Sequence, residues 1–548
     1  MLGRIAGILR PPVRLIEPEP GSVRVERDVA IRVRDGTLLQ VNVFRPPAEG
    51  RFPVILSAHP YGKDNLPRRR LGIDQIPLQY RVLRQRPVAF SIFTTWEAPD
   101  PMRWVAHGYV VVNADLRGCG SSEGTGSILS DQEGEDVFDL IEWSARQPWS
   151  SGKVGMNGVS YLAISQYKAA SLHPSGLAAI CAWEGFTDAY GDLAYPGGIP
   201  EDGFIRMWSR QLKKSRLAFD IRQFSAAHPL RDESWRLLAP KLAQIEVPIL
   251  VCGSFSDHCL HSRGSFRAFC ETGSPYRELY THRGCKWATF YSEEAFAAQL
   301  AFFNRFLKSG VETAQMTKIR LEVRSERDKV VEVREESSWP LDRTVWTPLY
   351  FSSSAELAAA APQVPGSTTF KAHSEAARFS WSVPSDIELT GPMAVHLWLE
   401  LEDGSDIDLF VGVELWRQGR YVGFEGSYGY GRDRVTTGWL KVSLRELDQE
   451  RTRAWAPEHT FLNPQAMHAG EIAAVDVALA PSATLFRRGD ELRLIIAGRW
   501  LSPTGLLTGQ YPAAYPGRPA GRCILHWGPE RRAHLLVPVI PALKDPKA

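Results

Sequence analysis

Residues 154–163 read Val-Gly-Met-Asn-Gly-Val-Ser-Tyr-Leu-Ala, and this stretch decides how the first half of the chain is expected to fold. The apolar residues 154–156 predict a short buried strand, and an Ala-rich helical pattern follows from Tyr161 onward. Ser160 is therefore expected at a sharp turn from strand to helix. Such a turn holds a serine Oγ clear of the sheet, while the N–H of the next residue faces a developing oxyanion at the helix N-terminus.

The glycine pattern around this turn is incomplete. Gly158 matches the usual Gly-x-Ser-x-Gly pattern, but Leu162 occupies the position of the second glycine, and Ala163 supplies a small side chain one residue later. Small residues are needed there because the strand and the helix approach each other closely. The motif alone leaves two interpretations of Ser160, a catalytic nucleophile or an ordinary turn serine.

The composition of the chain excludes several classes of protein. At 548 residues the chain is too long for one core, and its 64 basic and 62 acidic side chains nearly cancel. This balance argues against a nucleic-acid partner, and no apolar run reaches the ~18 residues of a membrane span. The seven cysteines form no Cys-x-x-Cys pair, which predicts neither a disulfide framework nor a thiolate zinc site. A reducing cytoplasm fits this cysteine usage best.

The first part of the chain alternates strand and helix patterns. Residues 54–57 and 110–114 are short apolar runs bounded by turn residues, as in buried parallel strands. Residues 178–183 and 247–252 continue the series after the predicted turn at Ser160. These patterns predict an α/β fold with a doubly wound sheet.

Two other regions depart from this alternation. Gly/Pro-rich loops and amphipathic helices predict a helical cap over the carboxyl edge of the sheet at residues 186–246. After residue 307 short strands recur, among them 319–323 and 393–401, and they predict a jelly-roll β-sandwich. The expected domains are an α/β domain of residues 1–185 and 247–310, a cap of residues 186–246 and a jelly roll of residues 311–548.

A serine nucleophile needs a base and an acid, which follow it in the order Asp/Glu, then His, in α/β enzymes of this kind. Asp257 is the expected acid because it follows a predicted strand in a Gly-Ser-Phe-Ser-Asp turn, although an Asx-turn or a helix N-cap could equally use it. His282 is the expected base because it directly follows the last predicted strand. His258 and His261 rank below it, since His258 adjoins the acid and His261 could fall on the following helix.

An oxyanion needs two hydrogen-bond donors, and the N–H of Tyr161 is the first. The second is expected in the segment His-Pro-Tyr-Gly-Lys at residues 59–63, where either the backbone or the Tyr61 hydroxyl could donate. A buried structural tyrosine is the alternative. Trp183, beside the end of a predicted strand, could line the substrate pocket, although a core tryptophan is an equal interpretation.

Several motifs in this chain resemble those of one enzyme family. They are Arg34-Asp35-Gly36, Pro60-Tyr61-Gly62-Lys63, Asp-Leu-Arg-Gly-Cys-Gly-Ser-Ser-Glu-Gly at 115–124, Gln-Pro-Trp-Ser-Ser-Gly-Lys-Val-Gly at 147–155, Gly-Val-Ser-Tyr-Leu at 158–162, and Asp-Ala-Tyr-Gly-Asp-Leu-Ala-Tyr-Pro-Gly-Gly at 188–198. In order and spacing, over nearly the whole chain, they resemble the cocaine esterase and X-prolyl dipeptidyl-peptidase (CocE/NonD) family of serine α/β-hydrolases. Residues 94–101 look like a marker of a separate branch of that family.

The resemblance implies a hydrolase domain with an inserted helical cap and a carboxyl-terminal jelly roll that packs over the active site. It also implies that Ser160 is the nucleophile and that the Tyr61 hydroxyl stabilises the oxyanion beside the N–H of Tyr161. Relatives read Gly-Pro-Trp-x-His after the last strand, whereas residues 281–287 read Thr-His-Arg-Gly-Cys-Lys-Trp. The usual histidine position can therefore fall on Lys286, and His282 is expected to act from an earlier place in the loop.

The leading hypothesis is a serine hydrolase that cleaves a carboxylic ester or amide of a small molecule through an acyl-enzyme, with no cofactor and no metal. A homo-oligomer is possible. One alternative is an X-prolyl dipeptidyl aminopeptidase, in which Glu184, Asp188 or Glu201 would hold a substrate amino group, although fold stabilisation is the simpler use of these carboxylates. The other alternative is a catalytically inert protein that binds its partner through the jelly roll.

Overall fold

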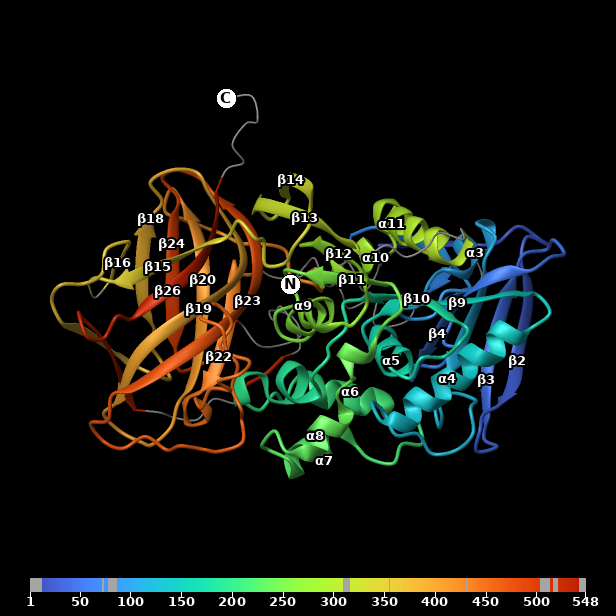
Figure 1. The fold of residues 1–548 in the computed structure, drawn as a ribbon, viewed down its shortest axis with the longest axis horizontal. Helices are drawn as coiled ribbons and strands as arrows, with labels where there is room; N and C mark the ends of the chain where they lie inside the picture. Colours follow the sequence, from blue (N-terminus) through green and yellow to red (C-terminus); the bar gives the residue numbers. More distant parts are fainter. Residues whose placement is uncertain are drawn as a thin grey trace.

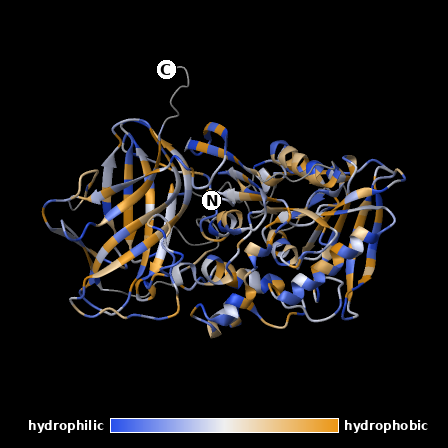
Figure 2. Ribbon diagram, viewed as in Figure 1, coloured by the Kyte–Doolittle hydropathy of each residue, from blue (hydrophilic) through white to orange (hydrophobic). Residues whose placement is uncertain are grey.

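The structure is a computed structural model that describes residues 12–70, 73–76, 86–308, 316–353, 355–429, 432–502, 513–515 and 521–541. A sheet flanked by helices forms one part of the molecule, and the carboxyl-terminal third of the chain forms an all-β part beside it (Figure 1). Hydrophobic residues run along the strands of both parts (Figure 2). Among the described residues, no helix combines the length and the apolar character that crossing a membrane requires.

One mixed sheet organises the first part. In order across the sheet, its strands are β2 (Arg24–Arg32), β3 (Leu38–Arg45), β8 (Val110–Asp115), β4 (Phe52–His59), β9 (Ser150–Val159), β10 (Leu177–Trp183), β11 (Ile249–Ser254), β12 (Tyr276–His282), β13 (Met316–Glu326) and β14 (Lys329–Glu336). Neighbours from β8 to β13 run parallel, and the pairings at both ends are antiparallel. The sheet confirms the α/β fold class.

Both faces of this sheet are covered. On β4, Val54 and Leu56 belong to one hydrophobic cluster, and Ile55 between them belongs to another. The helices on the first face are α4 (Asp131–Arg146) and α5 (Tyr161–Ala170), and those on the second are α3 (Pro101–Ala106) and α11 (Glu293–Phe303). Because neither face meets water, the parallel strands read as continuous apolar runs rather than as alternating patterns.

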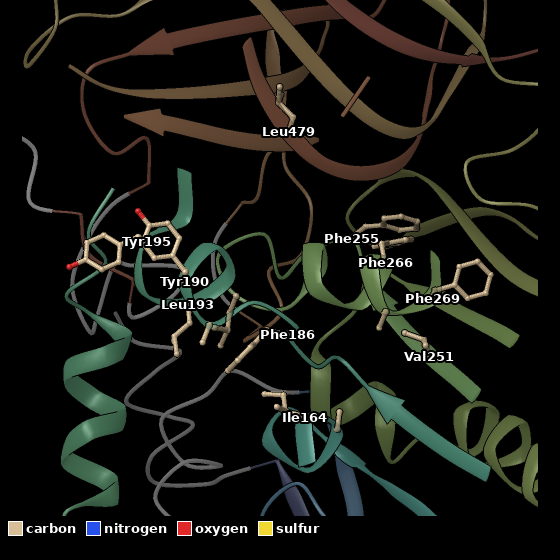
Figure 3. Close-up of a cluster of buried hydrophobic side chains, with 14 of the residues drawn as sticks. Ile164, Phe186, Tyr190, Leu193, Tyr195, Val251, Phe255, Phe266, Phe269 and Leu479 are labelled. Atoms are coloured by element: carbon tan, nitrogen blue, oxygen red, sulfur yellow. The ribbon is translucent and has the colours of Figure 1, made fainter. Parts of the chain in front are cut away.

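Between β10 and β11 the chain leaves the sheet and forms an insertion. Its elements are a π-helix (Ala189–Ala194), a 3-10 turn (Pro196–Gly198), α6 (Phe204–Leu212), α7 (Ile221–Ala227), α8 (Glu233–Leu238) and a second 3-10 turn (Leu242–Gln244). Tyr190 and Tyr195 of this insertion belong to the cluster that also includes Ile164 of α5 and Leu479 of the all-β part (Figure 3). One core therefore joins the sheet, the insertion and the all-β part.

Among its described residues, the all-β part contains two packed sheets. In the first, β19 (Ile387–Leu401) pairs with β23 (Ala473–Phe486) on one side and with β25 (Arg522–Trp527) and β26 (His534–Ile540) on the other, and β15 (Val345–Phe351), β16 (Leu357–Ala358) and β17 (Gly366–Lys371) extend it. The second contains β18 (Ala377–Ser382), β24 (Glu491–Ala497), β20 (Asp408–Arg417), β21 (Arg420–Val422) and β22 (Thr436–Lys441). Leu397 of the first sheet and Val411 of the second share one core.

Smaller elements complete the fold. They are the strand pairs β1 (Val13–Ile16) with β7 (Val88–Ser91) and β5 (Arg68–Arg70) with β6 (Ile73–Gln75), the helices α9 (Ser262–Glu271) and α10 (Lys286–Phe290), a π-turn (Asn304–Lys308) and a 3-10 turn (Val442–Leu444). Helix α9 follows β11, and α10 follows β12, so both begin at the carboxyl edge of the parallel sheet.

One predicted strand joins the two parts of the molecule. Residues 319–323, expected in the jelly roll, lie in β13, which pairs in parallel with β12 of the first sheet and, at Arg324, with β23 of the all-β part. Ile319, Leu321 and Val323 are buried in the core, and apolar alternation alone does not say which sheet a strand joins. The first sheet thus continues past residue 310, and the domain boundaries at 185 and 246 stay predictions.

Arg283, directly after β12, connects the two parts. Its buried guanidinium donates to the backbone oxygens of Arg434 and Val435, the second at 3.0 Å, and to Ser482 Oγ at 3.3 Å. It also lies 3.8 Å from the ring centroid of Phe424. Burial lowers the pKa of Arg283 to about 9, so the energetic cost of placing this charge between the two parts is high and its hydrogen bonds offset it.

We expect the substitution Arg283→Met to lower the free energy of unfolding by about 2–4 kcal/mol, because buried carbonyls and hydroxyls of the all-β part lose their donor. Chemical denaturation followed by tryptophan fluorescence measures the change. Arg451→Met is the matched control, since Arg451 also links the parts, through an exposed 2.8 Å ion pair with Glu271. That control is expected to cost less than about 1 kcal/mol. Equal costs for both variants would contradict the role of Arg283.

Candidate active site

Ser160 lies at the junction of β9 and α5, with backbone angles φ 60° and ψ −114°. A positive φ is costly for a serine, and such residues persist where the surrounding structure holds them, often at functional turns. The N–H of Ser160 donates to the carbonyl oxygen of Trp183 at 2.9 Å, which ties the turn to the end of β10. The strand-to-helix turn expected at this serine is present.

Close packing explains which residues around the turn are small. A Cβ on Gly158, whose φ is +152°, would lie 2.4 Å from the Cβ of Leu162. A Cβ on Gly185 would lie 2.9 Å from the Cβ of Ala163. Leu162 therefore needs the glycine at position 158, and Ala163 faces the bare backbone of Gly185 on the segment after β10.

A histidine and an aspartate continue from the serine in a hydrogen-bonded series. His261 Nε2 lies 3.0 Å from Ser160 Oγ, and His261 Nδ1 lies 2.6 Å from Asp257 Oδ2. The side chains of His261 and Asp257 are almost completely buried, and the ring of Phe186 stacks on the imidazole at 6.3 Å between centroids. The three side chains have the order and contacts of a Ser-His-Asp triad.

The local backbone brings this histidine and this aspartate together. The loop after β11 closes into one helical turn, in which the carbonyl oxygen of Asp257 accepts from the N–H groups of His261 and Ser262 at 3.2 Å and 3.0 Å. Residues four apart on such a turn share a face. The signal for this base in the sequence is therefore the Asp-x-x-x-His spacing, which chain order alone does not distinguish.

The expectation that His282 contacts Ser160 is wrong. His282 is the last residue of β12, and its Nε2 lies 2.9 Å from Glu184 Oε1 while its Nδ1 accepts from the N–H of Gly284 at 3.1 Å. Both ring nitrogens are thus used by neighbours other than the serine. The physical reason is the parallel register with β11, which places His282 at the end of β12. Glu184, which directly follows β10, lies beside it there.

The two tyrosines proposed for the oxyanion lie next to each other. Tyr161 is the first residue of α5, and its hydroxyl donates to Glu133 Oε2 at 2.5 Å, so its N–H rather than its hydroxyl is the candidate oxyanion donor. Tyr61 follows β4, and its ring meets that of Tyr161 edge-on at 6.3 Å. Burial, assisted by the nearby carboxyl of Glu97, raises the pKa of Tyr61 well above its usual value, which keeps the hydroxyl protonated as a donor.

A buried lysine lies against the histidine and the aspartate. Lys286 Nζ, on α10, is 2.6 Å from Asp257 Oδ2, 2.8 Å from His261 Nδ1 and 3.8 Å from Glu184 Oε2. Burial alone would raise the pKa of Asp257, but the ammonium of Lys286 and the ring of His261 hold it well below its usual range. Burial and the same ammonium lower the pKa of His261, which favours the neutral imidazole that a general base requires.

Glu97 occupies a second unusual position nearby. It has φ 66°, its carbonyl oxygen accepts from the N–H of Val159 at 3.0 Å, and its Oε1 accepts from Trp287 Nε1 at 3.3 Å. Burial raises the pKa of Glu97 to about 8, so the carboxyl is mostly protonated at neutral pH. The segment that carries Glu97, at residues 94–101, thus borders the strand that ends at the serine turn.

Trp183 packs in the core on the second face of the sheet. Its side chain is completely buried in the second cluster, with ring centroids 5.1 Å from Tyr280 and 5.5 Å from Phe290. The physical reason is that the side chain of the last residue of β10 points into the sheet's second face, while its carbonyl oxygen supports the Ser160 turn. The core interpretation of this tryptophan is the one that the structure supports.

The all-β part contacts both loops that carry these groups. Ser256 Oγ donates to the carbonyl oxygen of Glu425 at 2.5 Å, and the N–H of Lys286 donates to that of Ser427 at 2.8 Å. On the same side, His258 Nδ1 lies 3.1 Å from Thr437 Oγ1. This assigns His258 to the interface between the parts rather than to the serine.

Glu184, Cys252 and His282 are close enough together to suggest a metal site, with ligand atoms within 4.8 Å of one another. Their own hydrogen bonds argue against it. Because His282 Nδ1 accepts a backbone N–H, its Nε2 carries the proton that it donates to Glu184. Burial also raises the pKa of the Cys252 thiol well above its usual value, whereas a metal ligand must be a thiolate. We assign no metal to these residues.

A doubly wound sheet with a serine on the turn after a central strand, and a hydrogen-bonded imidazole and carboxylate beside it, defines the serine α/β-hydrolases. Comparison with known proteins agrees. Residues 35–225 match the family described as X-Pro dipeptidyl-peptidase (S15 family), and residues 310–531 match the X-Pro dipeptidyl-peptidase C-terminal non-catalytic domain. A solved CocE/NonD family hydrolase from Staphylococcus aureus is 34% identical, covers 94% of each chain and has a TM-score of 0.88.

The chain belongs to the CocE/NonD family of hydrolases. Among other relatives, the cocaine esterase of a Rhodococcus species is 24% identical over 95% of this chain and 99% of its own length. A putative serine esterase of Mycobacterium bovis is 30% identical over 33% of this chain and 28% of its own length. The protein is thus an enzyme, and its class is the serine hydrolases.

We expect Gly158→Ala to destabilise the serine turn, because the new Cβ would meet Leu162 at 2.4 Å and would force an alanine into a positive φ. The free energy of unfolding should fall by about 2 kcal/mol or more, and the rate of Ser160 modification by a fluorophosphonate should fall with it. Gly152→Ala is the matched control, since Gly152 also has a positive φ, +90°, but nothing lies within 4 Å of its Cβ position. An equal loss in both variants would show that backbone strain alone, not the contact with Leu162, accounts for it.

Proposed function

We propose that the enzyme hydrolyses carboxylic esters of small molecules through an acyl-enzyme on Ser160, with His261 as general base and Asp257 as its orienting acid. The contacts of His261, 3.0 Å to Ser160 Oγ and 2.6 Å to Asp257 Oδ2, carry this proposal. In the neutral ring, a proton on Nδ1 donates to Asp257, which leaves the lone pair of Nε2 directed at the serine hydroxyl.

The two half-reactions follow from that geometry. His261 Nε2 takes the proton of Ser160 as Oγ attacks the ester carbonyl, and the resulting imidazolium returns the proton to the departing alcohol. A water molecule then gives its proton to Nε2 and attacks the acyl carbonyl. Collapse of that intermediate releases the carboxylic acid and restores the protonated serine, so no cofactor is required.

We place the oxyanion between the N–H of Tyr161 and the hydroxyl of Tyr61. The first is supported by its position at the start of α5, directly after the nucleophile, where the helix N-terminus favours negative charge. The second is supported by the contact between the two tyrosine rings and by the raised pKa of Tyr61. Preorganised donors of this kind stabilise the charge that develops on the substrate oxygen.

The aminopeptidase alternative is weakened by the carboxylates it would use. Glu184 contacts His282 and Lys286, and Asp188 forms a 2.8 Å ion pair with Arg231. Glu201 accepts from backbone N–H groups at 2.7–3.0 Å, among them that of Ala514. Carboxylates with these partners serve the fold, which favours an ester over a peptide with a free amino group. Amide hydrolysis, as in an acylase, would use the same groups.

A fluorophosphonate probe tests the nucleophile. We expect the folded wild-type protein to be labelled at Ser160, and we expect Ser160→Ala to lose the label while keeping its unfolding temperature. Mass spectrometry of the labelled peptide gives the position. An inert binding protein would leave the wild type unlabelled, and equal labelling of both proteins would place the nucleophile elsewhere.

Paired histidine variants test the base. His261→Gln should lower kcat/KM for p-nitrophenyl esters by about 10³-fold, because no group remains to take the serine proton. His282→Gln should retain activity within about tenfold, because a glutamine amide can still donate to Glu184, although stability should fall. The reverse ranking of the two variants would refute the assignment of His261.

A further inference from the structure

Two carboxylates and one ammonium lie around the imidazole of His261. Asp257 faces the ring from the loop after β11, Lys286 from α10, and Glu184 from the segment after β10. Ser160 faces it from the serine turn, and Glu97 approaches the same lysine from the segment before α3. The side chains of Glu184 and Lys286 are completely buried, so bulk water screens their charges little.

The ammonium of Lys286 offsets one of two carboxylates near the imidazole. Asp257 and Glu184 bring two carboxylates to one buried site, and Glu97 is mostly neutral at neutral pH because burial raises its pKa to about 8. With the ammonium of Lys286 between the carboxylates, one net negative charge faces the imidazole. Without that ammonium, two net negative charges would face it, and each would favour the protonated ring that cannot act as a base.

We infer that Lys286 is a positioning residue that offsets the charge of Glu184 and anchors Asp257, so that His261 stays neutral and oriented toward Ser160 at neutral pH. The ion pair at 2.6 Å with Asp257 Oδ2 carries the inference, which rests on the proposed role of His261 as base. With the ring proton on Nδ1, the 2.8 Å approach of Lys286 Nζ to Nδ1 is a contact between two donors to one carboxylate oxygen, not a hydrogen bond. Because Lys286 and the ring N–H converge on the same carboxylate oxygen, a second positive charge on the ring is disfavoured.

The same contacts also fix the acid. Asp257 Oδ2 receives both donors, so its carboxylate cannot rotate away from His261 without breaking the ion pair with Lys286 as well. The carbonyl oxygen of Ser427, in the all-β part, holds the backbone of Lys286 through a 2.8 Å hydrogen bond. The position of the lysine is therefore set from outside the loop that carries the acid and the base.

Three variants test the charge balance through the pH dependence of kcat/KM for a p-nitrophenyl ester. Lys286→Met should move the acid limb to higher pH by about one unit or more, because a neighbouring cation is lost. Glu184→Gln should move it to lower pH, because a neighbouring anion is lost while the glutamine oxygen still accepts from His282. The double variant should return the limb to near its wild-type position, which a purely structural loss would not do.

The outcomes separate this inference from the proposed function. A wild-type protein that neither hydrolyses esters nor reacts with a fluorophosphonate would overturn the proposed function itself. An active enzyme whose acid limb is unchanged in Lys286→Met, or fails to return in the double variant, would overturn the role of the lysine alone. If Lys286→Met does not fold, the Glu184→Gln shift decides the question, since an unmoved or upward limb contradicts the inference.

Discussion

The reversal of the chain at Ser160 constrains everything around it. The turn holds a serine at positive φ, and it can do so only because Gly158 and Gly185 carry no side chain where the strand, the helix and the next strand converge. The carbonyl of Trp183 then secures the serine N–H. The hydroxyl of Ser160 meets His261 of the loop after β11, at the carboxyl edge of the sheet.

The base comes from the loop after β11, which carries His261, and not from the end of β12, where His282 lies. This difference explains why the prediction of His282 as the base is wrong. Strand patterns and the serine turn could be read from the sequence because burial on both faces leaves continuous apolar runs and because the turn demands small residues. Asp257 could be placed after its strand. His261 could not be selected by chain order, since it lies only four residues beyond the acid, on the turn that opens α9.

Other misassignments share one physical origin. Periodicity reports that a residue is buried, but it does not report which surface buries it. Trp183, for which a pocket wall and a core position were equal interpretations, packs in the second cluster, and the strand at residues 319–323 pairs with β12 as well as with the all-β part. His282 likewise lies at the end of the expected strand, but the carboxylate beside it, Glu184, comes from the segment after β10 and cannot be inferred from the sequence around His282.

The buried guanidinium of Arg283 limits the modularity of this protein. An arginine that donates to backbone oxygens across a seam between two regions keeps those acceptors only while both regions are present. In the catalytic half alone, water would replace the carbonyl oxygens around the guanidinium, and the backbone pairing of β13 with β23 would be lost. The two parts are therefore expected to unfold together, as one cooperative unit.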